Sequence, residues 1–212
     1  MAKPSLTLVQ VLGLKPVYHV SDLFETAGSR ATGYRLLSKL RELGFASETR
    51  KRGYFTLRSS VFQPYRLWPN LLPSLRAFKQ ARYFGRAYDE SDVNLARKLL
   101  KGFVTLDYRA YELTHFQTPY TFFVYVEDAE RQAKLLEKAG FSEGRRGRVA
   151  ILPKEGDNFD NEIQRVYLDC LAFGGRSTLD AIAIELLYGD KLSIKGEFPI
   201  ELVMKVREDL PS

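Results

Sequence analysis

The 212-residue sequence predicts an α+β protein with a small N-terminal part and a larger C-terminal part. Short β-prone runs alternate with segments in which apolar residues recur at helical spacing. Charge is divided unevenly: residues 1–86 carry 15 Lys and Arg against 4 Asp and Glu, a net +11, whereas residues 87–212 carry 17 against 22, a net −5. This division favours a polyanion-binding unit joined to a second domain. A solvated face of a heat-stable protein is the alternative.

The first 60 residues contain helix and strand signals in a definite order. They predict a short helix at 5–13, a strand at 17–20, a helix capped by Ser21 and closing at Gly28, a helix at 30–43 capped by Ser29, and strands at 45–48 and 54–57. Gly44 follows the longer helix and Gly53 lies between the two strands, where the chain needs a permissive backbone. This order is that of a winged helix-turn-helix domain.

In a winged helix-turn-helix domain, the second helix of the pair enters the major groove by its N-terminal end, and the hairpin tip lies along the phosphate backbone. A charged outer face is common on any amphipathic helix. The run Arg50-Lys51-Arg52, with only Glu48 as a nearby acid, has no evident folding role and favours DNA binding. We therefore expect contacts with double-stranded DNA from Ser29, Arg30, Thr32, Tyr34, Arg35, Lys39, Arg50, Lys51 and Arg52.

A proline-rich segment follows. Three prolines within residues 59–73 predict an irregular, rigid connector. We expect its aromatic side chains to pack the two parts together rather than stack on bases; they are Phe62, Tyr65 and Trp68. Residues 75–88 are predicted to be a basic helix that extends the anion-binding surface through Arg76, Lys79, Arg82 and Arg86. The predicted boundaries are thus 1–60 for the winged helix, 61–88 for the connector and basic helix, and 89–212 for the C-terminal domain.

The C-terminal part predicts strands separated by helices. The expected helices span 89–100, 108–113, 128–139, 163–171, 178–188 and 199–209, and the expected strands span 103–105, 121–126 and 148–152. The almost wholly apolar helix at 178–188 is predicted to lie at the centre of this domain. Cys170 is the single cysteine, so the chain forms no internal disulfide, and its apolar neighbours predict a buried side chain.

Two long runs resemble a known family. They are THFQTPYTFFVYVEDAERQAKLLEKAGFSEGRRGRVAILP and RVYLDCLAFGGRSTLDAIAIELLY, and the most specific stretch is YLDCLAFGGRSTLDA at residues 167–181. Together with the N-terminal pattern they resemble AbiEi-type proteins, which are winged-helix transcriptional regulators and antitoxins of type IV toxin–antitoxin pairs. The resemblance implies a repressor that binds inverted repeats upstream of its own operon. It also implies that the protein counters a nucleotidyltransferase-like toxin, without necessarily forming a stable complex with it. The proline-rich, aromatic connector departs from the family.

Catalytic patterns are weak in this sequence. A nucleotidyltransferase needs a Gly-Ser turn followed by paired carboxylates that hold two metal ions, and no such arrangement occurs. The acidic groups at Asp128 and Glu130, and in the loop GDNFDNE at 156–162, favour a helix start and a solvated loop. The run Gly174-Gly175-Arg176-Ser177 precedes a helix, where an anion can bind, but a tight turn is the preferred interpretation. We expect no enzyme activity, no metal and no cofactor.

The runner-up hypothesis is an RNA- or nucleotide-handling protein with a degenerate nucleotidyltransferase-like C-terminal domain. No stretch of 18 uncharged apolar residues occurs, and the first residues lack the layout of a signal peptide, so we expect a cytoplasmic protein without membrane contact. One recognition helix reads only a few base pairs. Useful specificity therefore predicts two half-sites and a homodimer.

Overall fold

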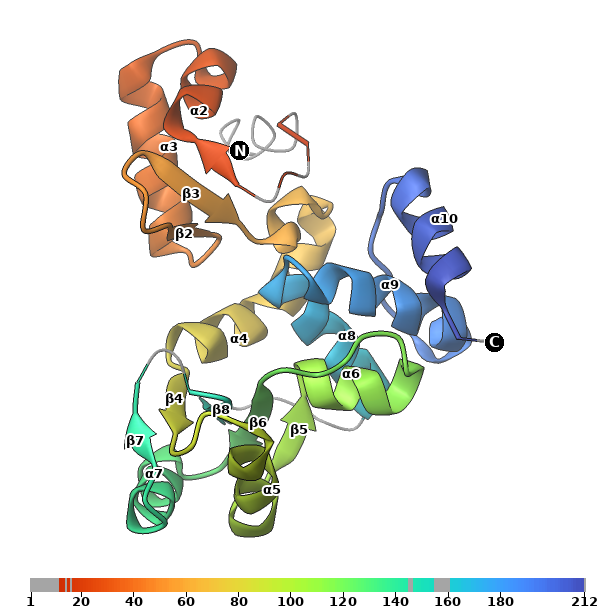
Figure 1. Ribbon diagram of the computed structural model, residues 1–212. Coiled ribbons are helices and arrows are strands. Elements are labelled where there is room, and N and C mark those ends of the chain that lie inside the picture. The colour runs from red at the N-terminus through yellow and green to blue at the C-terminus, as the bar shows by residue number, and fades with distance from the viewer. Residues whose placement is uncertain (1–11, 14, 16, 145–146, 155–160, 212) are drawn as a thin grey trace.

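The computed structural model describes residues 12–211 apart from 14, 16, 145–146 and 155–160. Within this described part, the protein is a mixed α+β fold with nine α-helices, one three-stranded sheet and one five-stranded sheet (Figure 1). The helix expected at residues 5–13 lies outside the described residues.

The N-terminal unit combines two helices with the three-stranded sheet. Its elements are β1 (Tyr18–His19), α2 (Val20–Ala27), α3 (Arg30–Glu42), β2 (Ala46–Glu48) and β3 (Tyr54–Leu57). The strands pair antiparallel in the order β1-β3-β2, so β2 and β3 form the expected hairpin and β1 extends it. Leu36, Leu37 and Leu40 of α3 are buried together with Phe55 of β3, which confirms the apolar stripe that the sequence predicts.

The caps of the two helices differ from the prediction at one position. Ser29 caps α3 as expected, because its Oγ accepts a hydrogen bond from the Thr32 amide at 3.1 Å. The cap predicted at Ser21 is wrong. Strand β1 runs directly into α2, so His19 becomes the capping residue: its Nδ1 accepts from the Ser21 amide, and the Asp22 carboxylate accepts from the His19 amide at 3.1 Å.

The proline-rich segment is far more regular than predicted. Two 3₁₀ turns, Ser59–Phe62 and Tyr65–Leu67, lead into α4 (Trp68–Lys79), and β4 (Arg82–Gly85) follows. Pro69 lies in the first turn of α4, where a missing amide removes no helical hydrogen bond, and Pro73 is accommodated inside the helix. The helix predicted at 75–88 is therefore confirmed only for residues 75–79, which belong to α4, and is wrong beyond them. Residues 82–85 are extended because they pair with strands on both sides.

The C-terminal part follows the predicted element order closely. It contains α5 (Glu90–Leu99), β5 (Phe103–Thr105), α6 (Leu106–Thr114), β6 (Phe122–Val126), α7 (Ala129–Lys138), β7 (Ser142–Glu143), β8 (Val149–Pro153), α8 (Glu162–Phe173), α9 (Ser177–Tyr188) and α10 (Ile200–Asp209). The sheet order is β5-β6-β8-β4-β7; β6 and β8 run parallel, and the other pairs run antiparallel. The sequence analysis did not predict β7. Strand β4 belongs to this sheet although it precedes residue 89, the predicted start of the C-terminal domain. The predicted division of the chain into domains stays a prediction.

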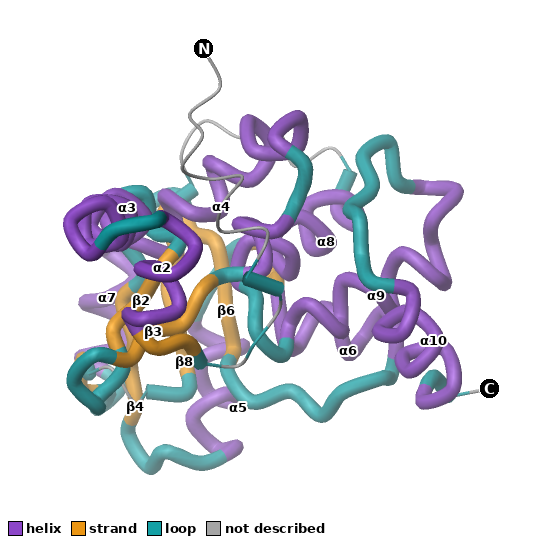
Figure 2. The backbone as a smooth tube through the Cα atoms, turned by 90° about the horizontal axis from the view of Figure 1, so that it is seen from above, coloured by secondary structure: helices purple, strands orange, loops and turns teal. Residues whose placement is uncertain are grey.

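The five-stranded sheet is covered on both faces. Alternate residues of β6 point to opposite sides: Phe123 belongs to the core with α4 and α8, whereas Phe122 and Val124 pack with Val93 of α5 and Leu136 of α7. Figure 1 shows α4 and α8 on one side of the sheet and α5 and α7 on the other. Helices α9 and α10 lie to one side of the strands (Figure 2). Helix α9, predicted at the centre of this domain, packs on α6, α8 and α10, and its residues 181–184 are buried among these helices rather than against the sheet.

A buried polar cluster joins Arg165 and Asp169 of α8 to Thr105 of β5 and Tyr125 of β6. The Asp169 carboxylate accepts hydrogen bonds from Thr105 Oγ1 at 2.6 Å and from the Tyr125 hydroxyl at 3.0 Å, and it lies 3.1 Å from Nη2 of Arg165. Burial raises the pKa of Asp169. The cluster ties α8 to strands β5 and β6, which is a structural role. Cys170, beside it, is buried as predicted, and burial raises the pKa of its thiol.

Arg58 connects the N-terminal unit to helix α8. Its Nε donates to the Gly44 carbonyl and its Nη1 to the Phe173 carbonyl, both at 3.0 Å. These carbonyls lie at the C-terminal ends of α3 and α8, where the helix dipole favours a cation. The backbones meet closely here, since a Cβ added to Gly174 would lie 2.5 Å from the Ser59 nitrogen. The end of α3 is thereby held against the end of α8.

The connector aromatics differ in their packing. Trp68 is buried as expected, with its ring centroid 5.3 Å from that of Phe45, and its Nε1 donates to the Ser60 carbonyl. Phe62 packs against Tyr18. Tyr65 stacks on Trp68 but leaves 53% of its side chain exposed.

Candidate nucleic-acid interface

Helix α3 presents its N-terminal half to solvent. Arg30, Tyr34 and Arg35 are exposed, whereas the apolar side of the helix is buried. Gly33 allows α2 to approach α3, because an added Cβ would lie 2.5 Å from the ring of Phe24. The same ring lies under two site residues: the Tyr34 ring is 5.0 Å away and the Arg30 guanidinium carbon is 5.9 Å above it. The packing of α2 thus positions the outer face of α3.

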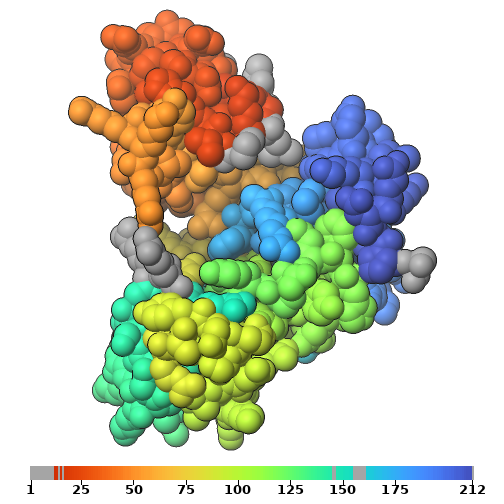
Figure 3. Space-filling model, in the orientation of Figure 1, coloured from red at the N-terminus to blue at the C-terminus, as the bar shows by residue number. Residues whose placement is uncertain are grey.

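The β2–β3 turn is held firmly by its backbone while its basic head groups are exposed. The Tyr54 amide donates to the Lys51 carbonyl, and the Thr49 amide donates to the Tyr54 carbonyl, both at 3.2 Å. Gly53 has a φ of 83°, which favours glycine in this turn. Arg50 and Arg52 are exposed, as is Lys51, whose Nζ lies 4.5 Å from the centre of the Tyr54 ring. In Figure 3 the orange hairpin projects from the N-terminal unit.

Helix α3 and the hairpin tip form the walls of one groove. Its volume is about 400 Å³, and Tyr34, Ser38 and Arg41 of α3 line it together with Arg52 and Gly53 of the turn. Arg41 of α3 and Arg52 of the tip therefore face the same groove, which Glu48 also lines. A single duplex can contact both only under this condition.

The predicted site residues occupy different positions around this groove. Tyr34 and Arg52 line it directly. Ser29 and Thr32 are at the start of α3, where their hydroxyls bond to each other at 2.9 Å and so build the cap. Lys39 is only partly exposed, in contrast to Arg30 and Arg35.

Two groove residues were missing from the predicted site. Ser38 and Arg41 line the groove although the sequence analysis did not select them. They follow Tyr34 by four and seven positions, so helical spacing places all three on one face and was the available signal. Arg41 is also 2.7 Å from the Glu48 carboxylate, which ties α3 to β2.

Unlike Arg41, the cations of this surface that the sequence predicts lack acidic partners among the described residues. Within the described ranges, no carboxylate forms an ion pair with Arg30 or Arg35 of α3, or with the basic residues at 50–52. An unpaired exposed cation keeps its capacity to displace counterions from a phosphate. The surface therefore combines concentrated positive charge with a groove.

The predicted extension of this surface is only partly present. Arg76 and Lys79 of α4 are exposed, and Lys79 Nζ donates to the Glu42 carbonyl at the end of α3. Arg82 instead binds Glu130 and Glu143, and Arg86 lies 3.8 Å from Asp92. The last two arginines hold the second sheet and its helices together.

No protein-family model, curated protein or solved structure matches this chain. In the part of the chain that the structure describes, no helix has the length and apolar character needed to cross a bilayer.

The acidic groups considered for metal chemistry have structural partners. Asp128 caps α7 by accepting a hydrogen bond from the Arg131 amide, and Glu130 pairs with Arg82. Glu162 pairs with Arg109, while residues 155–160 of the acidic loop lie outside the described residues. Among the described residues, no three His, Cys, Asp or Glu side chains group as a metal site would require.

Proposed function

We propose that residues 18–57 form a winged helix-turn-helix unit that binds double-stranded DNA, and that the protein is a sequence-specific transcriptional regulator. The observation that carries this proposal is the groove shared by Tyr34, Ser38 and Arg41 of α3 and by Arg52 of the β2–β3 turn. The antiparallel order β1-β3-β2 and the adjacent pair α2 and α3 support the same assignment.

The exposed residues divide into two roles. Arg30, Tyr34 and Arg35 lie in the N-terminal half of α3, from which side chains reach base edges in the major groove. Arg50 and Arg52 lie at the hairpin tip with Lys51, where they meet the phosphate backbone. The first set supplies sequence preference and the second supplies affinity for any duplex.

Salt-dependent binding to the DNA upstream of the gene tests the proposal. For the double variant Arg50→Ala/Arg52→Ala we expect weaker binding to all sequences and a slope of log K against log salt that is smaller by about 2. For Arg30→Ala or Arg35→Ala we expect a loss of about 1–3 kcal/mol that depends on sequence. The matched control, Arg131→Ala/Lys134→Ala on α7, removes the same charge from exposed positions elsewhere and should bind like the parent.

Two results would reject this assignment. One is a hairpin double variant that binds duplex DNA with the parent's affinity and salt slope. The other is a competition experiment in which single-stranded or structured RNA displaces the duplex at lower concentration, because that result favours an RNA-binding protein.

The resemblance to AbiEi-type proteins extends the proposal to an autorepressing antitoxin. Such a regulator binds inverted repeats, so a homodimer should bind a two-half-site operator more tightly than a single half-site. Expression of the neighbouring gene with and without this protein tests the antitoxin role. Growth arrest that this protein does not relieve would leave the regulator without an antitoxin function.

A further inference from the structure

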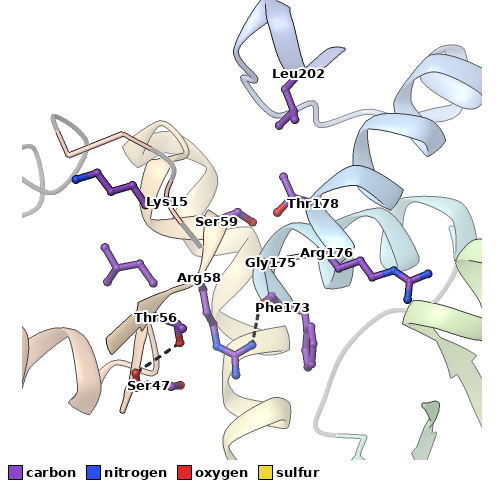
Figure 4. A pocket seen from close by; sticks show the side chains of 12 residues that line it. Lys15, Ser47, Thr56, Arg58, Ser59, Phe173, Gly175, Arg176, Thr178 and Leu202 are labelled. Atoms are coloured by element: carbon purple, nitrogen blue, oxygen red, sulfur yellow. Dashed lines mark hydrogen bonds between the residues drawn. The ribbon is translucent and has the colours of Figure 1, made fainter. Parts of the chain in front are cut away.

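A second cavity lies between the N-terminal sheet and the turn that joins α8 to α9 (Figure 4). Its volume is about 440 Å³, within the range of small-molecule sites. Thr56, Arg58 and Ser59 line it from the N-terminal side, and Gly175, Arg176 and Thr178 line it from the α9 side. The cavity is therefore built by both halves of the chain.

The lining carries positive charge and no acid. Lys15, Arg58 and Arg176 belong to it, and none of its residues is Asp or Glu. Both guanidinium groups bind neutral oxygens: Arg58 binds two backbone carbonyls, and Arg176 binds the Gln117 side chain and a carbonyl. Neither guanidinium forms an ion pair with a described carboxylate, whereas Lys15 Nζ lies 3.9 Å from the Asp22 carboxylate and Arg176 interacts with Asp180 electrostatically. The positive end of the α9 dipole adds to this potential.

The start of α9 offers hydrogen-bond donors that the protein itself does not use. Helix α9 has no side-chain cap. The amides of Ser177 and Thr178 bond to the carbonyls of Gly174 and Gly175, whereas those of Gly175 and Arg176 have no partner among the described residues. A Cβ added to Gly175 would meet open space, so the backbone is accessible there.

Thr178 points to a ligand independently of the helix end. The residue is 5% exposed, and its hydroxyl has no hydrogen-bond partner in the described part of the chain. Figure 4 shows this hydroxyl directed into the space beside Ser59. The hydroxyl oxygen is not among the fully buried unpartnered atoms, so it is reached from the cavity and can donate to an acceptor bound there.

We propose that this cavity binds a small anion through a phosphate or carboxylate group. The Thr178 hydroxyl and the amides of Gly175 and Arg176 donate to the anion, while Lys15 and Arg58 supply charge. A single phosphate leaves part of the cavity empty, so a metabolite with a larger body fits.

The regulatory consequence rests on the proposed function. Arg58 lines the cavity and also bonds to the Gly44 carbonyl at the end of α3. If a bound anion shifts α3 through Arg58, it must change the DNA affinity by the same factor by which DNA changes the anion affinity.

Isothermal titration with inorganic phosphate, and separately with citrate, tests the site without DNA. Ionic strength is held constant with sodium chloride. We expect the parent to bind at least one of the two anions and Thr178→Val to bind it about fivefold more weakly, because one hydrogen bond is lost. Lys15→Gln should weaken binding about twofold, as an exposed charge does. The matched control is Thr121→Val, whose hydroxyl lies outside the cavity and also has no described partner.

The hairpin is the competing anion site and needs its own control. Arg50→Ala/Arg52→Ala should keep the parent's anion affinity if the cavity is the site. Anion binding that is lost in this double variant, or that persists unchanged in Thr178→Val, overturns the proposal, as does a parent that binds neither anion. Because no DNA is present, a failure of the DNA-binding proposal would not produce any of these results.

Discussion

The arginines proposed to contact DNA and the arginines that join elements around the five-stranded sheet have opposite surroundings. Arg82 contacts Glu130 and Glu143, and Arg109 contacts Glu112 and Glu162. In the N-terminal unit, Arg30, Arg35 and the hairpin residues 50–52 have no such partner among the described carboxylates. The same residue type thus joins elements in one region and remains available for phosphate in the other. Pairing, rather than the number of arginines, separates a scaffold from a candidate interface.

The buried cations give a second contrast. Arg165 lies against the Asp169 carboxylate, whereas Arg58 is held by backbone carbonyls at two helix ends. Burial lowers the pKa of Arg58. Helix dipoles and carbonyls therefore replace a carboxylate at the junction between the two regions.

The largest expected effect comes from breaking the buried pair. Asp169→Ala removes the acid that Arg165, Tyr125 and Thr105 all contact. We expect a loss of about 3–5 kcal/mol in the free energy of unfolding, because a buried cation loses its partner. Urea denaturation measures this loss, with Thr105→Val as a milder control that removes one hydrogen bond. Equal stability of parent and Asp169→Ala would contradict a structural role for the cluster.

An intermediate effect is expected at Asp180. Burial, with a contribution from Asp107, raises the pKa of this carboxyl to about 7. The folded state therefore holds the proton more tightly than the unfolded chain, so stability from this group is full below pH 4 and is lost as pH rises through about 7. Asp180→Asn removes this pH-dependent part of the free energy of unfolding, which amounts to about 1.4 kcal/mol for each unit of pKa shift.

Thermal or urea unfolding between pH 5 and pH 8 measures this difference. The stability of the parent relative to Asp180→Asn should fall across the range. A difference that stays constant with pH would show that Asp180 titrates as an ordinary carboxyl.

The smallest effects sharpen the comparison between paired and unpaired arginines. Arg82→Ala should cost roughly 1 kcal/mol or less, because surface ion pairs contribute little, and should leave DNA affinity unchanged. Arg52→Ala should leave the free energy of unfolding within about 0.5 kcal/mol of the parent and weaken duplex binding. Urea denaturation and DNA titration measure the free energy of unfolding and the duplex affinity of each variant. If Arg82→Ala weakened duplex binding while Arg52→Ala lowered stability, the distinction between paired structural arginines and unpaired DNA-binding arginines would be wrong.

Local patterns anticipated much of the fold. The apolar spacing of α3, the glycines that follow it, and the β-rich runs of β6 and β8 encode their conformation within a few residues, and the structure confirms them. The pair of residues forming β7 carries no such pattern, and β4 follows the helical residues 75–79 with no proline or glycine between them to mark the end of the helix. These segments are strands because neighbouring strands satisfy their backbone hydrogen bonds.

The exposure of the arginines of α3 and of the hairpin was anticipated to a similar degree, since it follows from charge and helical spacing. Their role in DNA binding stays a prediction. Ser38 and Arg41 were missed because membership of the groove depends on where the hairpin folds back. The anion-binding interpretation of Gly174 to Ser177 was set aside because the run lacks a preceding strong strand and a P-loop lysine, and the sequence does not show that Thr178 lines a cavity.

By itself, the sequence determined which segments are helices with a buried stripe, where most of them begin and end, and that positive charge concentrates in the first 86 residues. These properties depend on neighbours a few positions apart along the chain. Only the tertiary structure decided which arginines have acidic partners, that β4 is a strand, and that a cavity separates β3 from α9. Those outcomes depend on contacts between residues far apart in the chain, which local spacing does not encode.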